Sequence, residues 1–110
     1  MDALTAFVTL DIRVGTIAHA ERLTDIRKSA YALTIDFGPP VGFKRSAAQV
    51  TALYAEHELV GRQVLGVVNL PPKKIGAFVS EVLVLGVADE SERVILLVPE
   101  RKAPNGAKLF

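Results

Sequence analysis

Three apolar segments in the second half of the chain constrain the fold more than any other feature. Residues 64–68, 82–85 and 94–98 are apolar at odd and even positions alike. Successive side chains of a strand point to opposite faces, so we expect both faces of each segment to be buried. The segments are separated by Pro71-Pro72 and by residues 89–92, with no helical stretch between them. Parallel strands need helical crossovers, so the pattern favours a closed or sandwiched antiparallel structure over a βαβ sheet.

The first half of the chain predicts two further long strands. Residues 7–21 are rich in β-branched side chains, and Gly15 within them marks an expected bend or bulge. Residues 31–37 alternate apolar and polar side chains, which predicts a strand with one solvated face. The polar stretch 22–29 between these strands is expected to form a surface loop.

A single short helix is expected near the middle of the chain. Residues 51–58 have a helical composition, with Thr51 as a plausible start and Gly61 as a stop. The remaining expected elements are the short segment 43–50 and strands at 63–70, 81–87 and 93–98. A helix inserted among five principal strands is the order of an OB barrel. We therefore predict an all-β, five-stranded OB-fold barrel with one short helix and terminal extensions, forming a single domain over residues 1–110.

The double-faced apolar strands also predict an oligomer. A small barrel buries only its inward face, so its outward apolar face needs a second cover. A second copy of the chain is the simplest cover, and we expect a homodimer. The alternative is that the N- and C-terminal tails fold back over this face.

The sequence offers little chemistry for catalysis. It has no cysteine, no phosphate-binding glycine loop, and only two histidines, neither within a motif. The neighbouring Glu56, His57 and Glu58 point in different directions on a helix, so they cannot converge on one metal ion. We expect no enzyme activity, no metal and no cofactor. The sequence shows neither a secretory signal nor an apolar run near the roughly 18 residues of a membrane span, so a cytoplasmic location is expected.

The charges are distributed unevenly although the formal net charge is only +1. Residues 41–80 carry five basic and two acidic groups, whereas residues 1–40 and 81–110 each carry four basic and five acidic groups. Basic, amide and hydroxyl side chains of the middle third are the types that bind phosphates, sugars and base edges. The candidate RNA-binding residues are Lys44, Arg45, Ser46, Gln49, Asn69, Lys73, Lys74 and Ser80. On charge alone, the pairs Lys44-Arg45 and Lys73-Lys74 could equally be ordinary solubilising residues.

Four blocks of sequence carry a resemblance to a known family. They are Leu10-Asp-Ile-Arg-Val-Gly-Thr-Ile17, Lys44-Arg-Ser-Ala-Ala-Gln-Val50, the stretch from Gly61 through Asn69-Leu-Pro-Pro-Lys-Lys-Ile75, and Ser80-Glu-Val-Leu-Val-Leu-Gly86. The combination resembles the CsaA family. That family is a free-standing, dimeric relative of the tRNA-binding domain appended to methionyl-tRNA synthetases, to the phenylalanyl-tRNA synthetase β chain and to the endothelial monocyte-activating polypeptide.

The resemblance implies two functions without choosing between them. Its domain relatives bind tRNA, which implies that this chain is a non-catalytic module for tRNA or other structured RNA. CsaA-like proteins are described as export chaperones, which implies binding of unfolded peptides or preproteins instead. The resemblance supports seven of the candidate residues named above, and Lys74 joins them by charge only. The aromatic residues near them in sequence are Phe43, Tyr54 and Phe78, each a candidate for base stacking or for the core.

Overall fold

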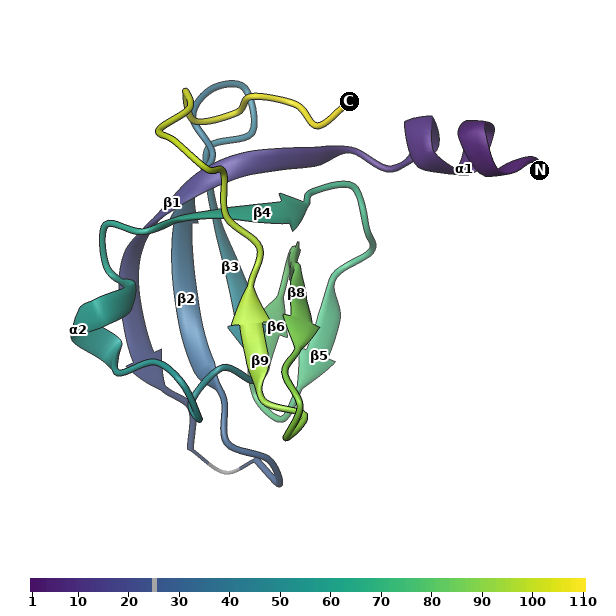
Figure 1. The fold of residues 1–110 in the computed structure, drawn as a ribbon. Helices are drawn as coiled ribbons and strands as arrows, with labels where there is room; N and C mark the ends of the chain where they lie inside the picture. Colours follow the sequence, from purple (N-terminus) through teal and green to yellow (C-terminus); the bar gives the residue numbers. More distant parts are fainter. Residues whose placement is uncertain (25) are drawn as a thin grey trace.

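Strand β1 (Ile12–Arg22) is the long central strand of a mostly β structure. The computed structural model describes residues 1–24 and 26–110, and Figure 1 shows the strands curling into a nearly closed antiparallel barrel. The other elements are α1 (Ala3–Thr9), β2 (Tyr31–Asp36), β3 (Phe43–Ala48), α2 (Glu56–Leu59), β4 (Gln63–Val67), β5 (Lys73–Ile75), β6 (Phe78–Ser80), β7 (Leu83–Val84), β8 (Gly86–Ala88) and β9 (Val94–Leu96). The five-stranded sheet has the order β3-β2-β1-β4-β7. The predicted five-stranded barrel is therefore confirmed, and the described part of the chain has two helices rather than the one expected.

Strand β1 pairs with different neighbours along its length. Its first half pairs with β4, from Ile12 opposite Val67 to Thr16 opposite Gln63. Its second half pairs with β2, and the register shifts between Ile17 and His19. A bulge of this kind bends a strand and increases its twist, which barrel closure requires. The bend expected at Gly15 thus lies two to four residues further on.

The barrel closes where β3 meets the segment that joins β6 to β7. The Glu81 amide donates to the Arg45 carbonyl (2.8 Å), and the Arg45 amide donates to Glu81 Oε1 (3.0 Å). The Ala47 amide donates to Ser80 Oγ (3.0 Å). Side-chain oxygens thus satisfy backbone donors of an edge strand that has no complete strand partner there.

The core lies inside the barrel and is apolar. Its fully buried side chains include Ile17, Leu33, Ile35, Phe37, Leu59 and Val64, each 0% exposed. Leu59 comes from α2, which packs against β1. The polar face of β2 is less exposed to solvent than the alternation of residues 31–37 predicts. Ala32 on this face is buried, and Thr34 and Asp36 are half-buried.

Two small hairpins extend the barrel. Strands β5 and β6 pair antiparallel across a two-residue turn at residues 76–77, where Gly76 has φ of 60°. Strands β8 and β9 pair from Gly86 opposite Leu96 to Ala88 opposite Val94. Hydrogen bonds from the backbone of Arg93 and Ser91 hold the pKa of the Asp89 carboxyl below its ordinary value and organise the turn of this second hairpin. The sequence predicts one continuous strand over 81–87, and this prediction is wrong because the segment divides into β7 and β8.

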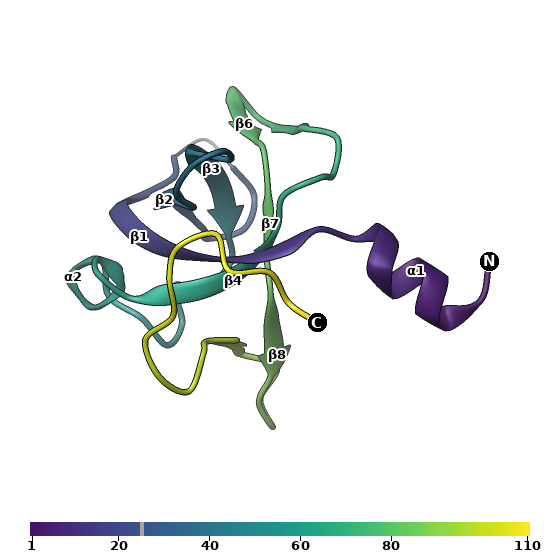
Figure 2. The ribbon, with the colours of Figure 1, turned by 90° about the horizontal axis from the view of Figure 1, so that it is seen from above.

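The N-terminal helix α1 corrects the strand predicted from residue 7. Asp2 caps the helix, since its carboxylate accepts from the Thr5 amide (2.8 Å), and this contact lowers the pKa of Asp2. The Thr9 hydroxyl donates a hydrogen bond to the Thr5 carbonyl (2.7 Å). The β-branched Val8 and Thr9 favour a strand only where a partner strand is present, and β1 begins at Ile12. Figure 2 shows α1 extending away from the barrel, and none of its residues is buried.

The central helix is shorter than predicted and begins later. Residues 51–53 form a turn, and α2 starts at Glu56. The Glu58 carboxylate accepts from the Ala55 amide (2.7 Å), and Ala55 is the N-cap, so the helix does not begin at Thr51. The loop predicted at 22–29 agrees with the end of β1 and the start of β2, and Asp25 within it lies outside the described residues.

The C-terminal segment lies along β1 as an irregular additional strand. The Val14 amide donates to Ala107 (2.9 Å), the Gly106 amide donates to Val14 (2.7 Å), and the Leu109 amide donates to Ile12 (2.8 Å). The C-terminal tail therefore covers part of β1, while outward residues such as Val87 and Ile95 stay 50% and 40% exposed. In the described part of the chain, no helix is long and apolar enough to cross a membrane.

Candidate binding groove

The alternation of β3 divides the candidate residues of this strand between its two faces. Arg45 is exposed and shares one face with Ala47, and Gln49, just after the strand, is also exposed and lines the same hollow as Ala47. Lys44 and Ser46 lie on the opposite face, and Ser46 is 0% exposed inside the barrel. The Ser46 hydroxyl donates to the Ala47 carbonyl (3.2 Å). Ser46 thus contributes to the interior of the barrel, and only Arg45 and Gln49 of this block share the outward surface.

The candidate residues of the β5–β6 hairpin also lie on two opposite faces. Residues directly opposite in an antiparallel pair share a face, so Lys73 shares a face with Ser80, to which it is paired. Ile75 and Phe78 lie on that same face, which meets β3, because the Ser80 hydroxyl accepts from the Ala47 amide. Lys74 pairs with Val79 on the other face of the hairpin. The neighbours Lys73 and Lys74 therefore lie on opposite faces of the hairpin.

Two hollows meet between β3 and this hairpin, and together they form what we call the hairpin groove. One hollow has a volume of about 380 Å³ and the other about 510 Å³, and both are lined by Ala47 and Ile75. The first is also lined by Leu70, Pro71, Lys73, Ser80, Glu81, Val82 and Leu83, and the second by Ile26, Arg27, Lys28, Ala30, Gln49 and Gly76. The groove has an apolar floor with cationic and amide side chains on its margin.

The margin of the hairpin groove contains cations that the sequence analysis missed. Arg27 and Lys28 come from the loop between β1 and β2, which was read only as a polar surface loop. The corresponding loop of OB barrels contributes to ligand binding, so its two adjacent cations were an available signal. No ion pair in the described part of the chain involves Arg27, Lys28 or Lys73.

Arg45 is held in place from several sides. Its guanidinium carbon lies 4.6 Å from the centroid of the Phe78 ring, and its Nη2 lies 3.7 Å from Glu21 Oε1. Phe78 is 8% exposed, whereas the Arg45 side chain is 47% exposed. Phe78 is therefore covered by a cation and offers no open ring to a base. Of the other aromatic candidates, Tyr54 uses its hydroxyl to accept from the Leu96 amide (3.1 Å), and Phe43 is 63% exposed.

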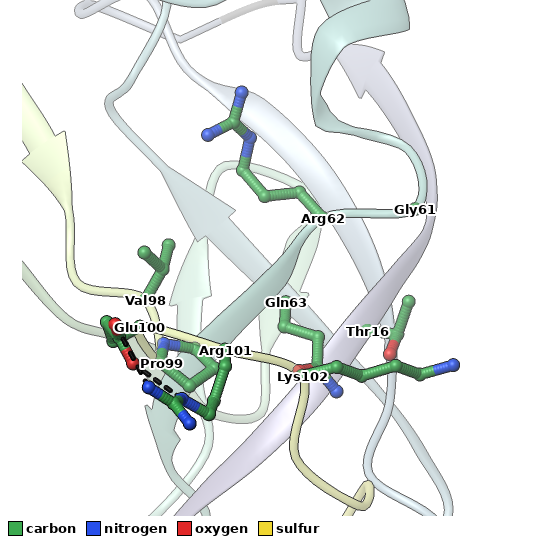
Figure 3. Close-up of a pocket in the computed structure, with 9 residues that line it drawn as sticks. All are labelled: Thr16, Gly61, Arg62, Gln63, Val98, Pro99, Glu100, Arg101 and Lys102. Carbon is green, nitrogen blue, oxygen red and sulfur yellow. Dashed lines mark hydrogen bonds and ion pairs between the residues drawn. The ribbon is translucent and has the colours of Figure 1, made fainter.

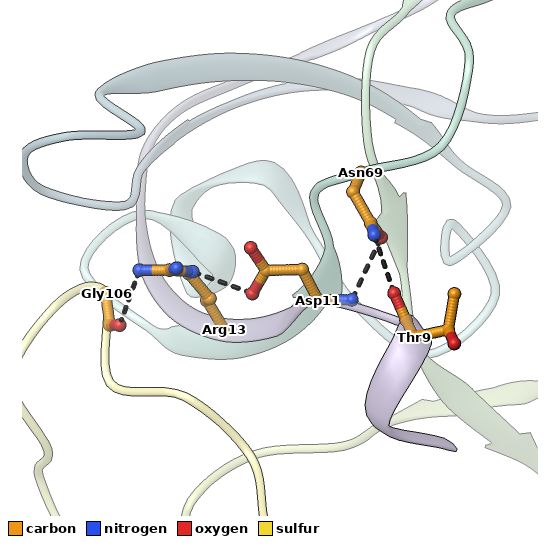
Figure 4. Close-up of polar contacts among 5 residues, drawn as sticks. All are labelled: Thr9, Asp11, Arg13, Asn69 and Gly106. Carbon is orange, nitrogen blue, oxygen red and sulfur yellow. Dashed lines mark hydrogen bonds and ion pairs between the residues drawn. The ribbon is translucent and has the colours of Figure 1, made fainter. Parts of the chain in front are cut away.

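Asn69 and Ser80 already make polar contacts within the chain. Figure 4 shows that the Asn69 amide group donates to the Thr9 carbonyl (2.8 Å), while Asn69 Oδ1 accepts from the Asp11 amide (2.9 Å). Nearby, Arg13 Nε donates to Asp11 Oδ1 (2.8 Å), which raises the pKa of Arg13. Asn69 thus ties the end of α1 to the loop that follows β4. Ser80 closes the barrel and donates to the Val82 carbonyl (3.3 Å).

A separate cleft lies between the start of β4 and the C-terminal segment. It has a volume of about 480 Å³ and includes Arg62, Arg101 and Lys102 (Figure 3). Arg101 pairs with Glu100 (2.7 Å), and Gln63 is occupied by hydrogen bonds to Ala103. None of the predicted site residues lines this cleft. Over residues 1–24 and 26–110, no group of three or more His, Asp or Glu side chains could hold a metal ion.

Comparison with known proteins identifies the family. The family model described as "Putative tRNA binding domain" matches residues 12–108. The chain belongs to this tRNA-binding-domain family. It is 38% identical over 100 residues to the methionine–tRNA ligase of Methanothrix thermoacetophila, covering 91% of this chain but only 14% of that enzyme. The chain thus corresponds to a small part of the ligase.

Two solved structures match the chain over nearly their whole length. A crystal structure of the chaperone CsaA from Bacillus anthracis is 46% identical, with a TM-score of 0.93, and the match covers 100% of this chain and 99% of that one. The CsaA chaperone from Picrophilus torridus is 42% identical, with a TM-score of 0.92 and 100% coverage of both chains. The resemblance to CsaA seen in the four sequence blocks is confirmed.

Proposed function

We propose that this chain is a chaperone of the CsaA type that binds unfolded segments of other proteins. The observation that carries the proposal is the full-length match to two CsaA chaperones, at 46% and 42% identity. The methionine–tRNA ligase, by contrast, contains the chain as a small fraction of its length. The strand order, with one helix between β3 and β4, is consistent with an OB barrel that acts by binding, whether of a polypeptide or of RNA.

The hairpin groove has the surface that an unfolded segment needs. Leu70 and Leu83 line it and are 36% and 50% exposed, and Ile75 and Ala47 continue the apolar floor. Contiguous exposed apolar surface with a polar margin is typical of a protein-binding site. An extended apolar segment entering this groove would remove these side chains from water, and burial of apolar area is the main favourable term in such binding.

Leu83→Asp tests the groove. We expect the variant to lose about tenfold or more of its affinity for a chemically unfolded, apolar-rich polypeptide, because a buried leucine contributes about 1.5–3 kcal/mol. Fluorescence anisotropy at low and at high salt measures the affinity for the labelled polypeptide. The affinity of the wild type should change little or increase with salt. Val60→Asp is the matched control, since Val60 is 51% exposed and does not line the groove. Equal losses in both variants, or no binding by the wild type, would contradict the proposal.

We further propose that the chain works as a homodimer joined through α1 and the C-terminal end. Leu4, Phe7 and Val8 of α1 are 73%, 39% and 61% exposed. Phe7 and Val8 line a hollow of about 300 Å³ together with Leu10, Lys108, Leu109 and Phe110. A seven-residue helix is marginal in water without packing, and α1 extends away from its own barrel (Figure 2). A second copy presenting the same surface would cover both helices by two-fold symmetry.

Val8→Glu is expected to convert the dimer to a monomer. The side chain is exposed in the single chain, so folding should be unaffected, whereas in the dimer a carboxylate would be buried without a partner. Sedimentation velocity at several micromolar concentrations should give twice 11.8 kDa for the wild type and 11.8 kDa for the variant. Val60→Glu should remain dimeric. A wild type that stays monomeric at these concentrations would refute the dimer.

A second function, binding of tRNA or other structured RNA, is supported by a different observation. The family model covers residues 12–108, and the hairpin groove is lined by the cations Arg27, Lys28 and Lys73 and by the amide of Gln49. Cations neutralise phosphates and release counterions, while an amide hydrogen-bonds to bases or sugars. RNA binding should weaken steeply as salt rises, which distinguishes it from apolar capture of a polypeptide.

A further inference from the structure

We propose that Arg45 forms a stacking platform for an unpaired RNA base in a second cleft, which adjoins the hairpin groove at Ile26 and Ile75. The inference rests on the RNA-binding function proposed above. The cleft has a volume of about 500 Å³ and is lined by the end of β1, by the first part of the loop that follows it, by Arg45 of β3 and by the β5–β6 hairpin. Its residues include Glu21, Arg22, Thr24, Ile26, Arg45 and Phe78.

The two arginines of this cleft are both ordered by buried aromatic rings. Arg45 lies 4.6 Å from the centroid of Phe78, and Arg22 lies 5.4 Å from the centroid of Tyr31. Tyr31 is 2% exposed, so each ring is covered and each guanidinium faces outward from it. The backbone of Arg45 is fixed by its two hydrogen bonds with Glu81 (2.8 and 3.0 Å). The residue therefore loses little conformational freedom when a ligand binds.

A planar guanidinium held in this way can replace an aromatic side chain. Bases that are splayed out of single-stranded RNA stack on aromatic rings or on arginine planes. The described residues of the cleft include no open aromatic ring, because Phe78 lies beneath Arg45. Arg45 remains 47% exposed and so presents its outer face to the cleft. Ile26, Ile75 and Ala77 supply apolar walls against which the edge of a base can pack.

The polar groups of the cleft favour a base over an apolar peptide side chain. Glu21 and Thr24 line the cleft, and a carboxylate accepts hydrogen bonds from the exocyclic amino groups of bases. An apolar aromatic side chain would leave these groups without partners, which is costly once water is excluded. Arg22 also lines the cleft and is suited to a phosphate beside the base, while Arg45, which lies 3.7 Å from Glu21, stacks on the base itself.

The test uses Arg45→Lys, which keeps the positive charge and removes the planar guanidinium group. The probe is a single-stranded RNA oligonucleotide carrying 2-aminopurine, whose fluorescence falls when the base stacks. We expect wild-type protein to quench the probe, and Arg45→Lys to abolish the quenching and to weaken binding about tenfold, the usual effect of one stacked base. An abasic oligonucleotide of the same length should bind both proteins equally. Arg62→Lys is the matched control, since Arg62 lies 5.2 Å from the Tyr54 ring but outside this cleft.

Each other outcome is informative. If wild-type protein binds RNA but Arg45→Lys quenches and binds as well as the wild type, the stacking platform is refuted while RNA binding stands. If wild-type protein binds no RNA, the RNA-binding function fails and this inference fails with it. If Arg45→Lys loses affinity for an aromatic-rich unfolded peptide and not for RNA, the cleft is a peptide site, and the inference is overturned.

Discussion

Phe37→Ala is expected to lower the free energy of unfolding by about 3–5 kcal/mol, which is a large part of the roughly 5–15 kcal/mol that stabilises a domain. Phe37 follows β2, is 0% exposed, and belongs to the main core cluster. Its removal leaves a cavity at the centre of the barrel that the stiff surrounding strands can fill only in part. Urea unfolding followed by circular dichroism should show a large fall in the midpoint.

Phe43→Ala is the control for this experiment. Phe43 lies opposite Asp36 in the β2–β3 ladder but is 63% exposed, so its truncation should cost less than about 1 kcal/mol. Comparable losses in the two variants would show that Phe37 is not part of a packed core. A second measurement uses Gly66, where an added methyl would lie 3.0 Å from the Phe37 ring. Gly66→Ala should therefore cost less in the Phe37→Ala background than in the wild type.

The sequence predicts the barrel well because its strongest signals are interior ones. The apolar segments 64–68, 82–85 and 94–98 contribute Val64, Val82 and Leu96 to the core. The expectation that both of their faces are buried is not met within the single chain, since Leu83, Ile95 and Val98 are 50%, 40% and 44% exposed. The N-terminal helix was missed because Val8 and Thr9 favour strands by composition, while the Asp2 cap and the absence of a partner strand decide the local structure. The hairpin of β5 and β6 was missed because each strand is three residues long and shows no periodicity.

The candidate site was predicted by residue type, and residue type does not determine which face of a strand a side chain occupies. Lys44 and Arg45 are adjacent in sequence yet lie on opposite faces of β3, and Lys73 and Lys74 are separated in the same way. Asn69 and Ser80 have the chemistry of RNA ligands, but each makes contacts that organise the fold. Arg27 joins the site only through the tertiary approach of its loop to Ile75. These contacts are long-range, so the order of residues along the chain does not reveal them.

This division between faces predicts which cations bind RNA. The double variant Arg27→Glu/Lys73→Glu should reduce tRNA affinity about 100-fold at moderate salt, because two phosphate contacts are replaced by repulsion. The slope of log K against log salt should become shallower by about 1.4–1.8, since each of the two lost phosphate contacts no longer releases its roughly 0.7–0.9 counterions. Titration at four or more salt concentrations measures both quantities.

The double variant Lys44→Glu/Lys74→Glu carries the same change in net charge, but both side chains lie on the faces away from the hairpin groove. We expect it to lose only the long-range attraction, a few-fold in affinity that disappears above the ionic strength at which exposed charges are screened, with a nearly unchanged slope at high salt. Circular dichroism should show both variants folded. If the two double variants weaken tRNA binding equally at every salt concentration, the protein attracts RNA through net charge alone, and the hairpin groove is not its RNA site.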